Sequence, residues 1–146
     1  MPDELSALIA GLRQPQKMIS PKYFYDETGS KLFDDITQLP EYYLTDTELG
    51  IMQAHIDEMA DVIGPEASLI EFGAGSGMKT RLLLEHMHAP AAYVPVDISE
   101  EHLLDSQRRI QEDFPDIEVL PVAADFLHPF DLPDPATMPR RNVVYF

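Results

Sequence analysis

The fold of this chain follows from the segment Ile70-Glu71-Phe72-Gly73-Ala74-Gly75-Ser76-Gly77-Met78-Lys79-Thr80. An apolar strand ends at an acidic residue, three glycines follow at alternate positions, and a helix is predicted to begin near Ser76. Glycine lacks Cβ, so its backbone can approach a bulky ligand and can adopt the positive φ of a tight turn. The turn faces a helix N-terminus, where unpaired N–H groups collect. These features predict a nucleotide-type cofactor site at the carboxyl end of a parallel strand.

The spacing of the glycines narrows the kind of cofactor. A dinucleotide-binding turn has the pattern G-x-G-x-x-G, whereas Gly73, Gly75 and Gly77 are each two residues apart. A P-loop is excluded because the Gly-Lys-Ser/Thr ending is missing. With the acidic residue in front, Glu71-x-Gly73-x-Gly75-x-Gly77 resembles motif I of the Rossmann-like methyltransferases that use S-adenosylmethionine. The alternatives are a glycine-rich turn that binds no ligand and, against the spacing, a nicotinamide-dependent oxidoreductase.

Composition and charge limit the partners of the chain. Its 146 residues are enough for one core and too few for two. With 10 Lys and Arg against 26 Asp and Glu, the net charge is −16. Such a surface repels phosphate backbones and anionic membranes, so neither nucleic acid nor a membrane is expected, whereas a small zwitterionic or cationic ligand fits. Cysteine is absent and the five histidines show no metal pattern, so no metal is expected.

The start of the chain contains neither a signal peptide nor an apolar segment long enough to span a bilayer. We therefore expect a cytoplasmic protein.

The order of predicted elements indicates an α/β fold. Residues 1–65 lack strand patterning and are interpreted as a helical cap that covers a substrate. In this cap Ser30 is expected to begin a short helix, and Thr45-x-x-Glu48 is expected to form a capping box. In residues 66–146, interpreted as a cofactor-binding Rossmann-like half-domain, strands alternating with helices predict a parallel sheet. The expected strands are Leu69–Phe72, Ala92–Val96, Ile117–Val122 and Asn142–Phe146.

The fourth expected strand is apolar and has no helix after it in this sequence. By fold logic it lies beside the first strand, near the middle of a complete sheet. An apolar parallel edge open to solvent is a feature that natural proteins avoid. We therefore expect a fold truncated after about the fourth strand, with the edge covered by a missing C-terminal part of the same protein or by self-association.

Acidic residues follow three successive strands. Glu71 is expected either to face the ammonium group of a ligand or to hold the glycine turn. Asp97 is expected to accept hydrogen bonds from both ribose hydroxyls. Asp125 suits the amino group of adenine, and the ring of Phe126 suits the face of the base. The alternative for each acid is capping of the next helix.

Lys79 lies in the first turn of the predicted helix, where the helix dipole disfavours positive charge. An anion such as the carboxylate of the cofactor would compensate it; the alternative is a solvated surface lysine. Tyr25, Tyr42 and Tyr43 lie outside the cofactor unit. Because a tyrosine buries its ring and keeps a hydroxyl that needs a partner, these residues suit a lid over a small polar substrate, or else simple packing of the cap.

The chain also resembles one family closely along nearly its whole length: the histidine-specific methyltransferases of ergothioneine biosynthesis, which convert histidine to trimethylhistidine (hercynine) by three methylations of the α-amino group. The matching segments are Tyr23-Phe24-Tyr25-Asp26-Glu27-Thr28-Gly29-Ser30, Leu39-Pro40-Glu41-Tyr42-Tyr43-Leu44-Thr45, Glu71 to Thr80, and Asp125-Phe126.

The resemblance implies roles for particular residues. Contacts to S-adenosylmethionine would come from Gly73, Lys79, Asp97, Asp125 and Phe126. One tyrosine of the Tyr42-Tyr43 pair would contact histidine, and Tyr25 would assist at its carboxylate or amine. In the family a further domain supplies an asparagine, a tyrosine and acidic residues that hold the imidazole and the amine, and these positions do not occur in this sequence.

The expected reaction is an in-line transfer of methyl from a sulfonium to a neutral amine, for which positioning of the two reactants supplies much of the acceleration. The sequence identifies no catalytic residue that would deprotonate the amine. Two alternatives remain open: a methyltransferase for another small amine, and a non-catalytic module that binds S-adenosylmethionine.

Overall fold

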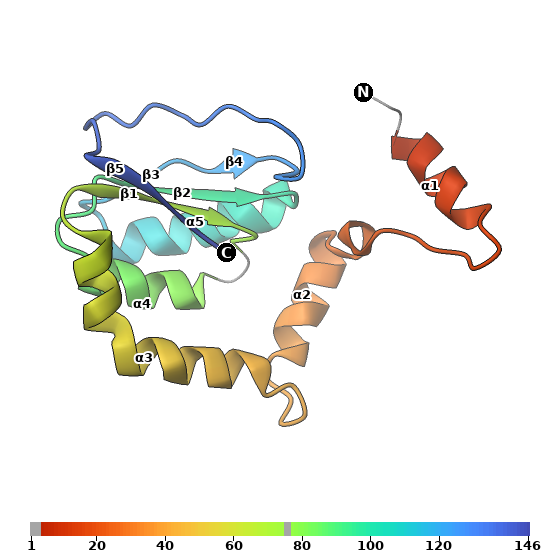
Figure 1. The fold of residues 1–146 in the computed structure, drawn as a ribbon, viewed down its shortest axis with the longest axis horizontal. Coiled ribbons are helices and arrows are strands. Elements are labelled where there is room, and N and C mark those ends of the chain that lie inside the picture. Colours follow the sequence, from red (N-terminus) through yellow and green to blue (C-terminus); the bar gives the residue numbers. More distant parts are fainter. Residues whose placement is uncertain (1–3, 75–76) are drawn as a thin grey trace.

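The computed structural model describes residues 4–74 and 77–146, and Figure 1 shows their arrangement. Along the chain the elements are α1 (Glu4–Leu12), the 3-10 helix η1 (Pro21–Phe24), α2 (Glu27–Ile36), α3 (Leu44–Ile63), β1 (Ala67–Phe72), α4 (Met78–His86), β2 (Ala92–Asp97), α5 (Glu100–Asp113), β3 (Glu118–Val119), β4 (Val122–Ala123) and β5 (Arg141–Tyr145).

The strands form one parallel sheet in the order β3-β2-β1-β5, with β4 also paired to β2. Leu69 of β1 lies between Tyr93 of β2 and Val143 of β5. The predicted α/β fold with a parallel sheet is therefore confirmed, and so is the place of the last strand beside the first. This strand order agrees with the Rossmann-like class I methyltransferase fold that the sequence predicts.

The third expected strand is interrupted. Its first part pairs with β2 through Val119 and its second part through Val122. Between them lies Pro121, opposite the segment of β2 that contains Pro95. Neither proline has an N–H group to donate to a ladder, so the pairing divides into the two short strands β3 and β4.

The two faces of the sheet are covered differently, as Figure 1 shows: helices lie on one face and an extended segment lies over the other. The larger core joins α3, α4 and α5 to the helical face, and its members include Met52, Ile56, Leu69, Leu83, Tyr93 and Ile110. On the opposite face Ile70, Val94 and Val96 pack with Phe130 from the proline-containing segment after β4. Packing on both faces holds the carboxyl ends of β1 and β2 in fixed positions.

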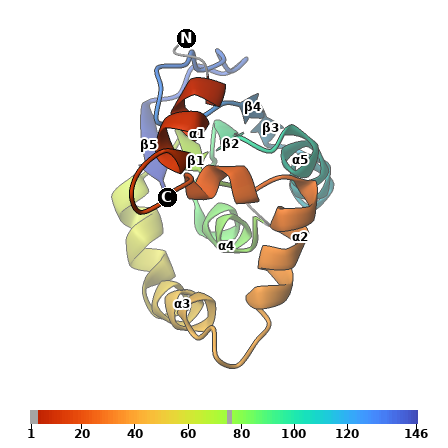
Figure 2. The ribbon, with the colours of Figure 1, turned by 90° about the vertical axis from the view of Figure 1, so that its right-hand side faces the viewer.

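The N-terminal elements α1, η1 and α2 form an arm in front of the carboxyl ends of the strands (Figure 2). Helix α2 begins at Glu27, because the carboxylate of Asp26 accepts a hydrogen bond from the N–H of Gly29 at 2.7 Å. The expectation that Ser30 begins this helix is wrong, since Ser30 lies inside it. A Cβ atom at position 29 would lie 1.6 Å from the carbonyl oxygen of Phe24, so only glycine lets η1 and α2 approach this closely.

The expected capping box at the start of α3 is also wrong. The residue before this helix is Tyr43, which makes no side-chain cap, and Thr45 already lies in the first turn. The carboxylate of Glu48 binds Lys79 of α4 instead of a backbone N–H of its own helix. A tertiary ion pair has replaced the local capping interaction.

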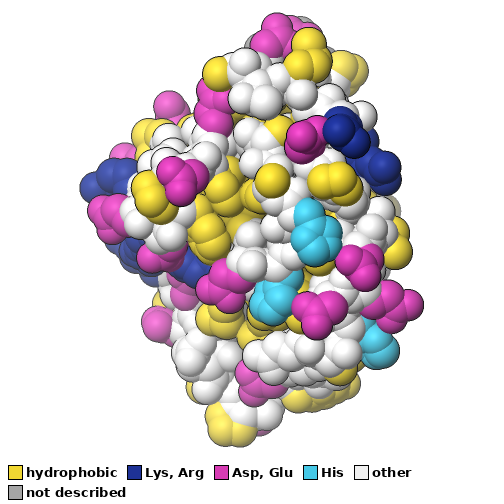
Figure 3. Space-filling model, turned by 90° about the vertical axis from the view of Figure 1, so that its left-hand side faces the viewer, with side chains coloured by type: hydrophobic (Ala, Val, Ile, Leu, Met, Phe, Trp, Pro, Cys, Tyr) yellow, Lys and Arg dark blue, Asp and Glu magenta, His cyan; other side chains and the backbone are white. Residues whose placement is uncertain are grey.

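Among the described residues, no helix combines the length and the apolarity needed to cross a membrane. Figure 3 shows the side of the molecule at the amino ends of the strands, where acidic side chains are spread over the surface with histidines among them.

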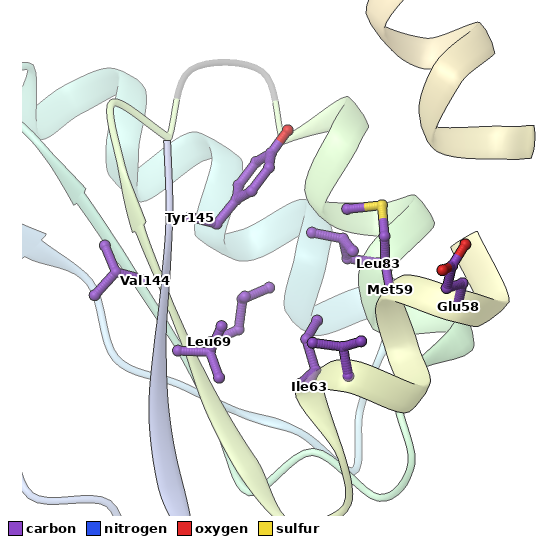
Figure 4. Close-up of a pocket in the computed structure, with 9 residues that line it drawn as sticks. Glu58, Met59, Ile63, Leu69, Leu83, Val144 and Tyr145 are labelled. Atoms are coloured by element: carbon purple, nitrogen blue, oxygen red, sulfur yellow. The ribbon is translucent and has the colours of Figure 1, made fainter. Parts of the chain in front are cut away.

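Strand β5 is the edge of the described sheet, and an apolar groove of about 400 Å³ separates it from α3. Figure 4 shows side chains of α3, α4, β1 and β5 that line this groove, among them Met59, Ile63, Leu69 and Leu83. Val144 on the edge strand is 48% exposed. The prediction of an apolar parallel edge is confirmed, while the identity of what covers it stays a prediction.

Candidate functional site

A cavity of about 550 Å³ lies between the carboxyl ends of the strands and the N-terminal arm. The strand side contributes Gly73 after β1, Asp97 at the end of β2 with Ile98 next to it, and Asp125 and Phe126 after β4. The arm contributes residues on the other side, including Lys22, Tyr25 and Phe33. Concave sites of this volume are typical of small-molecule and cofactor binding.

The glycine turn gives the cavity its open side. Gly73 has a φ of +74°, and its N–H donates to the carbonyl of Val96 at 2.8 Å, which ties the turn to β2. Among the described residues, no atom lies within 4 Å of a Cβ atom built at this position, apart from the glycine itself and its two chain neighbours. The absent side chain therefore leaves space toward the cavity, which is what the sequence predicts for close approach of a ligand.

Gly77, unlike Gly73, lies against neighbouring side chains. It precedes α4 with a φ of +70°, and a Cβ atom there would lie 3.2 Å from Oγ of Ser106 and 3.4 Å from Cδ1 of Ile110 on α5. This glycine lets α4 and α5 pack closely. Gly75, which the sequence also predicts to bind the cofactor, lies outside the described residues.

Asp97 ends β2 and lines the same cavity as Gly73. Its Oδ1 accepts a hydrogen bond from the N–H of Ser99 at 2.9 Å, which fixes the carboxylate at the strand end before α5. The neighbouring Ile98 is 41% exposed and adds an apolar wall. The carboxylate and the glycine turn are thus brought together, as the prediction of a cofactor site requires.

Asp125 and Phe126 form the third part of the wall. One carboxylate oxygen of Asp125 binds Nζ of Lys22 at 2.8 Å, and the other accepts from the N–H of Leu127 at 3.0 Å. The hydrogen bond from Lys22 holds the pKa of Asp125 below its usual range. The ring of Phe126 stacks on Phe72 with centroids 5.4 Å apart and an interplanar angle of 5°. The site therefore combines a charged acceptor with a flat apolar surface.

These wall residues fit a nucleoside-bearing cofactor. The carboxylates of Asp97 and Asp125 are acceptors for hydroxyl and amino donors, and Ile98 and Phe126 offer apolar surface to a base. The open space at Gly73 admits a ligand against the backbone. The size and the chemistry of the cavity both agree with an adenosine group.

Lys79 lies in the first turn of α4, outside the described wall of this cavity. Its Nζ is 3.0 Å from both carboxylate oxygens of Glu48, and it lies 5.7 Å from the ring centroid of Tyr145. The compensating anion in this structure is therefore a residue of α3. A contact between Lys79 and a cofactor stays a prediction.

Glu71 is buried beneath the glycine turn, with 3% of its surface exposed. Its Oε2 accepts hydrogen bonds from the hydroxyl of Tyr93, at 2.5 Å, and from the hydroxyl of Thr80. Burial raises the pKa of Glu71 despite these donors, and it raises the pKa of Tyr93 as well. These contacts join β1, β2 and α4, so they correspond to the second of the two expected roles, holding the turn; direct contact with a ligand stays a prediction.

The three tyrosines occupy different places. Tyr25 lines the cavity and packs edge-to-face on Phe33 at 5.9 Å, and Phe33 in turn packs on Tyr42 at 5.8 Å. Tyr43, before α3, is 66% exposed. The structure thus places Tyr25 at the cavity, connects Tyr42 to it through Phe33, and leaves Tyr43 on the surface.

Sequence reasoning missed several residues of the wall, among them Lys22, Phe33 and Ile98. Lys22 is separated from Asp125 by 103 positions, so no local pattern connects them. Ile98 directly follows Asp97, and its position beside a strand-ending acid is a signal that could have identified it.

Comparison with known proteins places the chain among methyltransferases. Residues 4–146 match the family described as "Histidine-specific methyltransferase, SAM-dependent". A histidine N-alpha-methyltransferase of Mycobacterium tuberculosis is 38% identical over 120 residues, which are 80% of this chain and 37% of that protein. Ergothioneine biosynthesis protein 1 of Neurospora crassa is 45% identical over 54% of this chain and 9% of that protein. The N-methyltransferase dtpB of Aspergillus flavus is 34% identical over 66% of this chain and 28% of that protein.

The chain therefore spans little more than a third of the length of the histidine N-alpha-methyltransferase that it matches.

Proposed function

The chain belongs to the family of histidine-specific methyltransferases that depend on S-adenosylmethionine, and from this premise we propose that it binds this cofactor and serves methylation of the α-amino group of histidine toward trimethylhistidine. Because the matched relatives are longer, we propose this activity for the chain together with the polypeptide that corresponds to their remaining length. We also propose residues 1–65 as the substrate-covering cap and residues 66–146 as the cofactor-binding part.

The observation that carries the proposal is the shared cavity of Gly73 and Asp97. A glycine turn that leaves open space and a carboxylate at the next strand end face one hollow of about 550 Å³. A ribose with two vicinal hydroxyls offers two donors to one carboxylate. In this assignment Asp97 holds the ribose of the cofactor.

The roles of Asp125 and Phe126 follow from their positions in the same wall, and those of Lys79 and Gly75 follow from the resemblance to the family. Asp125 accepts a hydrogen bond from the adenine amino group. Its two carboxylate oxygens already accept from Lys22 and from the N–H of Leu127, but each oxygen has two lone pairs and can therefore accept a second hydrogen bond. The ring of Phe126 covers the base. Lys79 receives the carboxylate of the methionine end. Gly75, which the sequence also predicts to bind the cofactor, lies outside the described residues. Glu71 keeps the turn in place from below.

The substrate side of the site is assigned to the tyrosines. Tyr25 faces the cavity and is suited to the carboxylate or the amine of histidine. Tyr42 and Tyr43 flank the start of α3, and one of them completes this contact. When bound, S-adenosylmethionine supplies a methyl group on a positively charged sulfur. The residues of this chain position the two reactants, and such positioning accounts for much of the rate in a reaction of this kind.

The relative named N-methyltransferase dtpB favours a second candidate, a methyltransferase for another small amine. The two candidates are separated by an incubation followed by mass spectrometry. The chain, joined to the polypeptide that corresponds to the remaining length of its relatives, is incubated with methyl-labelled S-adenosylmethionine and each amino acid in turn. We expect the label on histidine. Label on another amine alone would support the second candidate, and cofactor binding without transfer to any amine would support a non-catalytic binding module.

A further inference from the structure

The ion pair between Lys79 and Glu48 connects the first turn of α4 to α3. Nζ of Lys79 lies 3.0 Å from both oxygens of Glu48, and the hydroxyl of Tyr145 donates to Glu48 Oε1 at 3.3 Å. The side chains of Lys79 and Glu48 are 32% and 45% exposed. The pair is therefore well defined and still accessible to a ligand from solvent.

The charges around Lys79 are nearly balanced. The carboxylate of Glu48 neutralises the ammonium, and the buried carboxyl of Glu71 also interacts electrostatically with Lys79. Tyr145 faces the ammonium with an uncharged phenol, whose pKa is raised by burial. A carboxylate that approaches Lys79 therefore meets no net positive charge in this group, and it meets a like charge on Glu48.

We propose that Glu48 sets the affinity of the protein for the carboxylate end of an amino-acid-bearing ligand, because it competes with that carboxylate for Lys79. This inference rests on the proposed function, in which Lys79 receives the carboxylate of S-adenosylmethionine. An ammonium has three donors, and Glu48 takes two of them. A second carboxylate has to share Lys79 or displace Glu48 from it. Glu48 thereby limits binding of the amino-acid end without touching the nucleoside.

The test compares two ligands that differ in the amino-acid end. S-adenosylhomocysteine has the carboxylate, whereas 5′-methylthioadenosine has the same nucleoside and lacks the amino-acid group. Binding of both is measured by calorimetry to the native protein and to Glu48→Gln. We expect Glu48→Gln to bind S-adenosylhomocysteine about two- to fivefold more tightly, the range of a partly exposed ion pair. Binding of 5′-methylthioadenosine stays unchanged, which also shows that the variant is folded.

A double-mutant cycle separates competition from a structural effect. In the background of Lys79→Met, Glu48→Gln should no longer tighten S-adenosylhomocysteine, because the residue for which it competes is gone. Asp46→Asn is the matched control, since it removes an equal charge from an exposed position in the first turn of α3. It should leave both affinities unchanged.

Unchanged or weaker binding of S-adenosylhomocysteine to Glu48→Gln would overturn the inference, and so would an equal gain with Asp46→Asn. In either case the cofactor site itself would stand. If neither ligand binds the native protein, the proposed function fails together with the inference.

Discussion

Gly73 and Gly77 both have positive φ, and they should respond differently to a side chain. Gly73→Ala should lower the free energy of unfolding by about 1–2 kcal/mol, the cost of a left-handed alanine, because a Cβ atom there meets none of the described residues within 4 Å. Gly77→Ala should cost more, since its Cβ atom also presses on Ser106 and Ile110 of α5. Chemical denaturation of both variants measures the difference.

For ligand binding we expect the opposite order, with the larger effect in Gly73→Ala. Gly73 borders the cavity, so its alanine variant should lose more affinity for S-adenosylhomocysteine than the less stable Gly77→Ala variant. Equal stability of the two variants, or a greater loss of affinity in Gly77→Ala, would contradict the separate roles given to these glycines.

The buried carboxyl of Glu71 predicts a pH dependence of stability. Because burial raises its pKa, the folded protein holds this proton more tightly than the unfolded chain does. Its contribution to stability is therefore fully present at low pH and is lost as the pH rises through the folded-state pKa. Glu71→Gln keeps an acceptor for Tyr93 and Thr80 and removes the ionisation. The stability of this variant relative to the native protein should increase from about pH 4 upward.

Urea denaturation of the two proteins at several pH values gives that difference directly. Because both proteins contain the same other acids, including Asp125 with its lowered pKa, those contributions cancel in the comparison. A constant difference across the pH range, or one that decreases as pH rises, would show that Glu71 does not titrate as its burial implies.

At the scale of elements, the contact between η1 and α2 depends on Gly29. Gly29→Ala should separate these elements, because its Cβ atom would overlap the backbone carbonyl of Phe24. We expect a loss of about 1–3 kcal/mol and faster proteolysis of the arm before α2. Gly50→Ala in α3 is the matched control: a Cβ atom there meets nothing within 4 Å, so the change should stabilise the helix by about 0.5–1 kcal/mol. Slower cleavage or an unchanged stability of Gly29→Ala would refute this reading of the contact.

Elements that depend on local pattern could be predicted from the sequence. The four strand positions and the place of Asp97 at a strand end follow from runs of neighbouring residues. The helix start at Ser30 and the capping box at Thr45 were wrong, because Asp26 caps α2 and Glu48 pairs with another helix. In both cases the local contact that the sequence suggests does not form, and a different contact takes its place.

The site could be predicted only in part for the same reason. Gly73, Asp97, Asp125 and Phe126 come together because successive parallel strands end at one edge of the sheet, and sequence order indicates this. The opposite wall comes from the arm, whose docking onto the sheet includes the ion pair of Lys22 with Asp125. No spacing rule connects segments so far apart in the chain.

At the scale of the whole molecule, residues of the arm and residues at the carboxyl ends of the strands line the same cavity. The sheet side supplies carboxylates, and the arm supplies a lysine and aromatic rings. The large negative charge of the chain, −16, is compatible with a ligand that carries a sulfonium and an ammonium group. This organisation supports the proposal that a small cationic or zwitterionic nucleoside ligand binds between the arm and the sheet.

The most direct test is a calorimetric titration of the protein with S-adenosylhomocysteine, in parallel with Asp97→Asn and with the control Asp116→Asn at an exposed position. One molecule should bind per chain. The affinity should fall by about ten- to a hundredfold in Asp97→Asn, the range for hydrogen bonds to a charged group, and stay unchanged in Asp116→Asn. Equal affinity in native and Asp97→Asn protein, or tighter binding of NAD than of S-adenosylhomocysteine, would contradict the account.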